Sequence, residues 1–265
     1  MSVNEIILLL VSGVIVGIIN TLGGGGSVIT MSLFMAMGMP IGVANGTNRI
    51  AVLLQNLSAT VAFLRKGMLH IRSGVLLSIP AIVGNIFGAM VATEVSETVF
   101  KICLSVVLAV ILVYLLLGKD NQHVTGGHGL KIKWWHYLIF FVIGFYGGYI
   151  YIGLGFLILA LAIWTMKLDI ITANVIKGFV IFLSTPFALG VFIYNGQVEW
   201  IAGLLHGVGN IVGAVIASHW AMSWGVKFVR WFTLFIIVVF FIDLVGPLLN
   251  IEGWVSLQDL LSYLL

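Results

Sequence analysis

The chain has 265 residues, of which 61% are hydrophobic and only 8% are charged, and its formal net charge is +3. Soluble globular proteins carry about 25% charged residues, so this composition excludes a soluble fold. No basic block interleaved with aromatic residues occurs, and nucleic-acid binding is not expected. The single cysteine, Cys103, lies in an apolar run and lacks the partners that a disulfide or a metal cluster requires.

The apolar residues form long unbroken runs, such as residues 102–117 and 231–245, and do not alternate with polar residues as in the strands of a membrane barrel. A helix needs about 20 apolar residues to cross the hydrocarbon layer. The sequence therefore predicts an all-α polytopic membrane protein. The first run has no basic region before it and no small-residue cleavage site after it, so we expect a retained helix and not a signal peptide.

Ten apolar segments follow one another, five on each side of a polar stretch. In chain order they are residues 5–20, 27–38, 42–64, 71–93 and 97–117, and then 135–150, 153–166, 170–194, 199–218 and 226–249. We expect a first transmembrane repeat at 1–117, a linker at 118–134 and a second transmembrane repeat at 135–265.

The two halves share sequence. Residues 83–92, VGNIFGAMVA, match residues 208–217, VGNIVGAVIA, at seven of ten positions. Earlier in each half, Ala44-Asn45 matches Ala173-Asn174 at the offset that also aligns the two glycine-rich breaks. Because each half has an odd number of segments, the second half is predicted to be inverted relative to the first.

The charged residues of the loops test this orientation, because short cytoplasmic loops collect Lys and Arg. They predict that the linker is cytoplasmic and that both termini are external, on the periplasmic side of a cell inner membrane. The basic residues on the cytoplasmic side are Arg65, Lys66, Arg72, Lys119, Lys131, Lys133, Lys167, Lys227 and Arg230, and the acidic residues on the other side are Glu94, Glu97, Glu199, Glu252 and Asp259.

The stretch Asn20 to Ser27 interrupts the first apolar region with four consecutive glycines. Glycine disfavours helix, and the following segment of about 12 residues would be only about 18 Å long. We predict an unwound section inside the membrane, followed by a helix whose free N-terminal amides, with the hydroxyls of Thr21 and Ser27, bind an anion. The alternative is that the glycines only allow close helix packing. The counterpart at 147–155 is weaker and more apolar, and the same two readings apply there.

Two cations, Arg49 and Lys177, lie several residues inside apolar segments. A charge at that depth costs at least about 2.5 kcal/mol unless it faces partners or water, which makes both residues functional candidates. Asn45, Thr47 and Asn48 accompany Arg49, and Asn174 precedes Lys177 by one helical turn. The alternative is that each cation snorkels or binds helix carbonyls. No intramembrane carboxylate is placed to pair with either cation.

His206 lies inside an apolar segment, where it either carries a proton or bonds to a neighbouring helix. No close set of His, Cys or carboxylate residues suggests a metal, and no cofactor is expected. A serine-histidine hydrolase using Ser27 and His206 would lack the motif around the nucleophile. The absence of a Walker motif argues against ATP-driven pumping by this chain.

The sequence resembles the TauE/SafE family of sulfite exporters and related permeases over nearly its whole length. The motifs that carry the resemblance are Asn20-Thr21-Leu22-Gly23-Gly24-Gly25-Gly26-Ser27, Gly38-Met39-Pro40, Ala44-Asn45-Gly46-Thr47-Asn48-Arg49, the Gly67 loop, Ala173-Asn174-Val175-Ile176-Lys177 and Gly196-Gln197-Val198-Glu199-Trp200. The resemblance implies inverted repeats and transport of small sulfur-containing or organic anions, without an ATP-hydrolysing subunit. Ile176 stands where the first repeat has Thr47, which is a departure from a symmetric pair of anion sites.

Together these features predict a secondary transporter or facilitator that moves sulfite or a related small anion by alternating access, in contact with the lipid bilayer. The open alternatives are an anion channel, a scaffold subunit and, least favoured, an intramembrane enzyme. A homodimer is compatible with the sequence, which does not define the oligomeric state. The predicted substrate-binding residues are Asn20, Thr21, Gly23, Gly24, Gly25, Gly26, Ser27, Asn45, Thr47, Asn48, Arg49, Asn174 and Lys177.

Overall fold

The computed structural model describes residues 1–22, 25–96 and 132–220, together with a few positions between 98 and 109 and between 235 and 242. Its helices are α1 (Val3–Leu22), α2 (Ser27–Ala36), α3 (Ile41–Arg65), α4 (Ile71–Glu94), α6 (Trp134–Tyr149), α7 (Leu154–Met166), α8 (Ile170–Tyr194) and α9 (Trp200–Trp220). Each lies within two residues of a segment predicted from the sequence, and no strand occurs among the described residues. The predicted segments 97–117 and 226–249, and most of the linker 118–134, fall outside the described residues.

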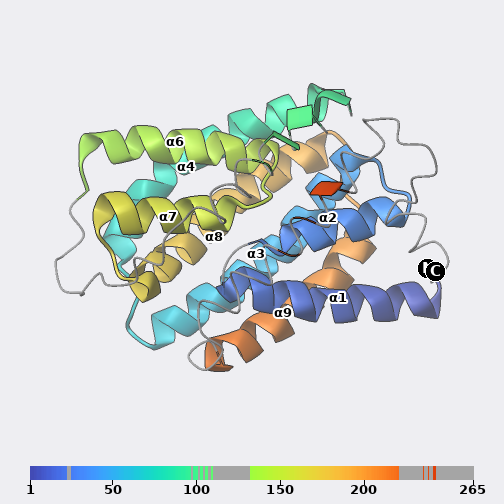
Figure 1. Ribbon diagram of the computed structural model, residues 1–265, viewed down its shortest axis with the longest axis horizontal. Coiled ribbons are helices and arrows are strands. Elements are labelled where there is room, and N and C mark those ends of the chain that lie inside the picture. The colour runs from blue at the N-terminus through green and yellow to red at the C-terminus, as the bar shows by residue number, and fades with distance from the viewer. Residues whose placement is uncertain are drawn as a thin grey trace.

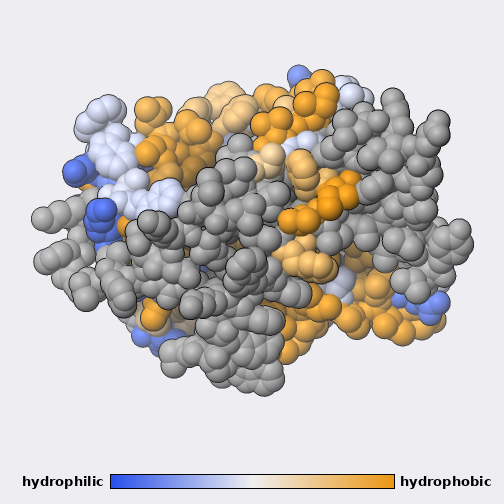
Figure 2. All heavy atoms as spheres, in the orientation of Figure 1, coloured by the Kyte–Doolittle hydropathy of each residue, from blue (hydrophilic) through white to orange (hydrophobic). Residues whose placement is uncertain are grey.

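Four of these helices, α1, α4, α8 and α9, are long and apolar enough to cross a membrane. The α3 helix has 25 residues but carries many polar side chains, whereas α2 and α7 have only 10 and 13 residues. At about 1.5 Å per residue, α2 and α7 are too short to cross the hydrocarbon layer. Among the residues that are coloured in Figure 2, hydrophobic ones lie along the upper edge and at the lower right of the drawn face, while hydrophilic ones gather mainly at its left end. The chain is a helical membrane protein.

Close backbone contacts join α4 to α6 and α1 to α9, and glycine makes both possible. A Cβ atom at Gly88 of α4 would lie 1.9 Å from the carbonyl oxygen of Phe145 on α6, and one at Gly213 of α9 would lie 2.1 Å from the carbonyl oxygen of Val14 on α1. Both glycines belong to the decapeptide that the two halves share. Gly84 of α4 makes a similar approach, since its Cβ atom would lie 2.1 Å from the carbonyl oxygen of Phe141 on α6, so small residues four apart bring the two backbones together.

The helix pairs are reciprocal between the halves. In Figure 1, α1 and α9 lie along one long edge of the molecule, α4 and α6 lie along the other, and α3 and α8 lie between them. The α9 helix packs on α1 and α3, and α4 packs on α6 and α8, so each half places its fourth helix against the other half. This arrangement is compatible with two related repeats, although their inversion across a membrane stays a prediction.

The two short helices occupy the interior. On α2 the side chains of Val28, Met31 and Phe34 are buried, and on α7 those of Ile158 and Ala162 are buried. The ends of α1 and α6 and the starts of α2 and α7 lie near the middle of the long axis in Figure 1. Both predicted helix breaks therefore lie deep in the protein.

Candidate functional site: two cations at two helix breaks

The α3 helix carries an unusual number of buried polar side chains. Its buried polar residues are Asn45, Thr47, Asn48, Arg49, Gln55, Asn56 and Thr60. Burying a polar group is costly unless it is hydrogen-bonded. The partners of these side chains therefore decide which of them hold the fold together and which could hold a ligand.

Arg49 is fully buried and binds the C-terminal end of α6. Its guanidinium donates to the carbonyl oxygens of Gly147 (2.5 Å) and Gly148 (2.8 Å) and to Asn45 Oδ1 (3.0 Å). The charge also faces the rings of Tyr151 and Phe192, at 4.8 and 5.4 Å. A cation at a helix C-terminus is favoured by the helix dipole, so Arg49 clamps the end of α6. The reading of Arg49 as a tie to helix carbonyls is the one that the geometry favours.

Asn45 and Thr47 complete this clamp. Asn45 donates to the carbonyl oxygen of Tyr149 at 2.9 Å, and the Thr47 hydroxyl accepts the amide of Glu199 at 2.9 Å, directly before α9 begins. Both side chains therefore have structural partners. The clamp connects α3 to the break between α6 and α7 and to the start of α9.

Lys177 is 4% exposed and binds the other break. Its Nζ atom donates to the carbonyl oxygen of Asn20, near the end of α1, at 3.2 Å. An ammonium group has three donors, and this bond is the one that the described residues provide. The ion pair found among the described residues joins Met1 to Glu5, so neither Lys177 nor Arg49 has a carboxylate partner there. Lys177 therefore uses one of its three donors, whereas Arg49 makes three hydrogen bonds and keeps its Nε donor without a partner.

The turn between α1 and α2 is held by Asn20. Its Oδ1 atom accepts the Gly26 amide at 2.7 Å, and the amides of Val28 and Ile29 bond to the carbonyl oxygens of Gly25 (3.3 Å) and Gly26 (3.0 Å). The expectation of free amides at the start of α2 is therefore wrong at these positions, because a tight turn and the Asn20 side chain satisfy them. Gly23 and Gly24 lie outside the described residues.

Four of the predicted residues keep a buried polar atom without a partner. These atoms are Ser27 Oγ, Asn48 Nδ2, Arg49 Nε and Asn174 Oδ1. Ser27 and Asn48 are at most 1% exposed, so water in the bulk does not satisfy them. Unpaired buried polar atoms are rare in native proteins and call for an explanation such as an unseen ligand. Ser27 begins α2 directly after the turn that Asn20 holds.

Gln55 belongs to the α1–α2 break and was missed in the sequence. Its Oε1 atom accepts from Asn20 Nδ2 at 3.2 Å, and its Nε2 atom donates to the Thr21 hydroxyl at 3.4 Å. Gln55 follows Asn48 by seven residues, which is two helical turns and the same face of α3. This seven-residue spacing is the sequence signal that could have identified Gln55. The predicted residues Asn20 and Thr21 thus bind α3 through Gln55.

His206 is fully buried in a hydrogen-bonded network. Nδ1 lies 3.1 Å from the carbonyl oxygen of Leu9, which can only accept, so we assign the proton to Nδ1. Nε2 then accepts from the hydroxyl of Thr30 on α2, at 2.9 Å, and Ser12 lies 3.3 Å from Nδ1. Of the two readings of His206, the network favours the histidine bonded to neighbouring helices. Ser27 takes no part in the network, which gives no support to a serine-histidine pair.

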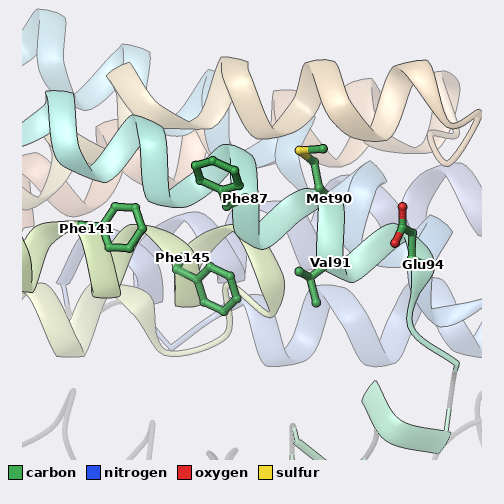
Figure 3. Close-up of a pocket in the computed structure, with 6 residues that line it drawn as sticks. All are labelled: Phe87, Met90, Val91, Glu94, Phe141 and Phe145. Atoms are coloured by element: carbon green, nitrogen blue, oxygen red, sulfur yellow. The ribbon is translucent and has the colours of Figure 1, made fainter.

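An open groove of about 560 Å³ between α4 and α6 does not have the chemistry of an anion site. Figure 3 shows its lining residues, Phe87, Met90, Val91, Glu94, Phe141 and Phe145. The lining is apolar except for Glu94, whose carboxylate would repel an anion. The candidate site is therefore the pair of breaks and not this groove.

Comparison with known proteins identifies the family of this chain. The profile of a family described as "Sulfite exporter TauE/SafE" matches residues 9–244. The chain belongs to the TauE/SafE family. The matched residues include both breaks, both cations, the greater part of α1 and the whole of every other helix described above.

Curated relatives of this TauE/SafE chain are named as membrane transporters. The "Probable membrane transporter protein ORF9" of a Sinorhizobium species is 30% identical over 223 residues, which is 84% of this chain and 85% of that protein. A "Probable membrane transporter protein" of Haemophilus influenzae is 24% identical over 86% of this chain and 90% of its own length. "Probable membrane transporter protein YfcA" of Escherichia coli is 26% identical over 81% of this chain and 80% of its own length. No solved structure matches.

Proposed function

We propose that this membrane protein is a secondary transporter or facilitator that moves a small anion, with sulfite or a related sulfur-containing or organic anion as substrate. The observation that carries the proposal is Lys177: a buried ammonium with one carbonyl partner and no carboxylate among the described residues. A buried charge of this kind is costly and is characteristic of ion and substrate pathways. The family description and the names of the relatives support transport, and the description names sulfite.

The proposed site is the α1–α2 break. The Lys177 ammonium supplies the positive charge, and the Ser27 hydroxyl and the Asn48 amide supply uncharged donors that now lack partners. Hydrogen bonds from charged donors to oxyanions are stronger than neutral ones. Arg49, Asn45 and Thr47 act one step away, by holding the α6–α7 break and the start of α9 in place. Discontinuous helices that meet near the membrane midplane are a common way to build such a site.

Alternating access requires that the site open to each side in turn. The reciprocal packing of α1 with α9 and of α4 with α6 supports two inverted repeats, and the basic loop residues support a cytoplasmic linker with external termini in an inner membrane. The α1–α2 break lies near the middle of the long axis in Figure 1, away from both ends of the molecule. A small shift of the surrounding helices would therefore change the side from which the break is exposed.

The test is uptake of labelled sulfite, with acetate and sulfate as competitors, into proteoliposomes that contain the purified protein. Lys177→Gln is expected to reduce uptake at least tenfold, and Ser27→Ala and Asn48→Ala to weaken sulfite binding. Lys66→Gln is the matched control, because it removes one positive charge at the exposed C-terminal end of α3.

Saturable uptake that sulfite on the far side stimulates would identify a transporter. Uptake that does not saturate and shows no such stimulation would identify a channel. If no small anion enters the proteoliposomes, or if uptake by Lys177→Gln equals that of wild type, the proposed function is wrong. A role as a scaffold subunit would then be favoured.

A further inference from the structure

The described helices form two groups that do not coincide with the two sequence halves. The first group contains α1, α2, α3 and α9, and the second contains α4, α6, α7 and α8. Extensive helix contacts occur within each group, such as α1 with α9, α3 with α9, α4 with α6 and α4 with α8. We call these groups the first bundle and the second bundle.

The seam between the bundles is formed mainly by one helix pair, and one buried hydrophobic cluster with members from α1, α2, α4 and α8 also crosses it. Of the helix pairs with extensive contact among the described residues, α3 with α8 is the one that crosses from one bundle to the other. Two helix pairs inside the bundles, α1 with α9 and α4 with α6, pack more closely, because their glycines bring backbone against backbone. A Cβ atom at Gly148 would lie 2.1 Å from the carbonyl oxygen of Asn85, and one at Gly17 would lie 2.3 Å from that of Asn210. Such close packing resists sliding.

The buried cations lie across the seam. Arg49 belongs to the first bundle and binds carbonyl oxygens of α6 in the second, while Lys177 belongs to the second bundle and binds the Asn20 carbonyl oxygen in the first. The Arg49 tie is multiple and is reinforced by Asn45, which donates to Tyr149. The Lys177 tie is a single bond of 3.2 Å. The Arg49 tie is therefore the harder one to break, whereas the single Lys177 bond can be replaced by another acceptor.

We propose that the moving units of this protein are the two exchanged bundles, which rock against each other along α3 and α8, and that the Lys177–Asn20 bond is the tie that opens. The part that names an anion as the trigger rests on the proposed function. An anion that takes the Lys177 ammonium competes with the Asn20 carbonyl oxygen, so occupancy loosens the seam at the α1–α2 break. The Arg49 clamp then acts as the fixed point of the motion.

Distances between spin labels on exposed side chains test this inference. With Cys103→Ser as background, the pairs Val11→Cys with Val212→Cys and Val83→Cys with Val142→Cys each lie within one bundle, and the pair Val11→Cys with Val142→Cys spans both. All four valines are at least 43% exposed on the surface of their helices, so the labels do not enter the packed interior. Each pair is measured in lipid nanodiscs with and without sulfite, and again with Lys177→Met.

The expected result is a second distance population, or a shift, for the pair that spans both bundles, and unchanged distances for both pairs within a bundle. Lys177→Met is expected to produce this change without any anion, because it removes the tie. If sulfite has no effect on wild type while Lys177→Met has the expected effect, the anion assignment fails and the bundle motion stands.

The inference is overturned if the Val11–Val212 distance changes as much as the Val11–Val142 distance, since that is the signature of sequence halves that move as units. It is also overturned if no pair responds to Lys177→Met.

Discussion

At the scale of single residues, the two buried cations differ in what holds them. Arg49 makes three hydrogen bonds and faces two aromatic rings, whereas Lys177 makes one hydrogen bond. The sequence placed both cations inside the membrane and left open whether each was structural. Their partners are carbonyl groups of distant helices, and no local pattern in the sequence encodes that contact.

Arg49→Gln is therefore expected to lower stability, and Lys177→Met is expected to abolish uptake with little change in stability. Arg49→Gln removes charged hydrogen bonds to two carbonyl groups and should lower the free energy of unfolding by about 3 kcal/mol. Lys177→Met removes a buried charge with a single bond and should leave it within about 1 kcal/mol of wild type, or above it, while uptake is lost. Thermal unfolding in detergent and uptake in proteoliposomes measure the two effects. A Lys177→Met protein that unfolds like Arg49→Gln would show that Lys177 is structural.

The His206 network predicts a structural histidine. Because Nδ1 donates to the Leu9 carbonyl oxygen and Nε2 accepts from Thr30, His206→Leu leaves several buried groups unpaired and should lower the free energy of unfolding by about 2 kcal/mol or more. His206→Gln, which keeps one polar contact, should fall between. The pH profile of uptake should be the same in His206→Gln as in wild type. A profile that loses its pH dependence would instead identify His206 as a proton carrier.

At the scale of helices, glycine decides which elements pair. The decapeptide that the two halves share contains glycines four residues apart, and the structure places these glycines at contacts between helices of different halves. Its glycines match two different partners, α6 and α1, because each half contributes the same small-residue surface. The sequence shows that these helices have a surface of small residues, but it does not show which helix packs against that surface.

Gly88→Ala should disrupt the α4–α6 pair, since its Cβ atom would lie 1.9 Å from the backbone oxygen of Phe145. We expect a loss of at least about 2 kcal/mol in the free energy of unfolding. Gly190→Ala on α8 is the matched control, because nothing lies within 4 Å of its Cβ position, and this change should stabilise the helix by about 0.5–1 kcal/mol. Differential scanning fluorimetry compares the two variants. Equal melting temperatures would contradict the close α4–α6 contact.

Asp169 is the N-cap of α8, the helix that carries Lys177. Burial raises the pKa of the Asp169 carboxyl, but hydrogen bonds from Thr172 and Ile171 outweigh it, and the pKa lies below its ordinary value. A lowered pKa in the folded state adds stability above the pKa of the unfolded chain, and this stability is lost as the pH falls through the folded pKa. Asp169→Ala should therefore cost about 1 kcal/mol at neutral pH, and less in acid.

Unfolding of wild type, Asp169→Ala and Asp169→Asn at neutral and acidic pH checks this expectation. Asp169→Asn keeps an acceptor for the same amides, so it should lie close to wild type at low pH. A cost for Asp169→Ala that is the same at every pH would show that the charge of Asp169 contributes nothing.

At the scale of the whole molecule, the described helices of the two halves share a core, since one buried cluster contains residues of both halves. The α4 helix of the first half packs on α6 and α8, and the α9 helix of the second half packs on α1 and α3. The division at the linker 118–134 therefore describes the sequence repeat, and the packing follows the two bundles.

A chain split between Gly126 and Gly127 tests this organisation. Each half alone exposes the glycine-rich faces of its helices, so we expect it to aggregate or to be degraded in the membrane. Coexpression of both halves should restore a complex that an affinity tag on one half recovers. Halves that each remain monodisperse alone would contradict the exchanged packing.

The sequence by itself determined that this protein is a helical membrane protein of the TauE/SafE family, with helix breaks at its glycine-rich stretches and two cations inside the membrane. Hydropathy, helix propensity and glycine content are local properties, so a single chain reveals them. Only the tertiary structure decided that the amides at the start of α2 are already bonded and that Arg49 and Lys177 bind the ends of broken helices. It also decided that α4 and α9 each pack against helices of the other half. Those outcomes depend on carbonyl groups and backbone surfaces far away in the chain, which meet only when the helices have packed.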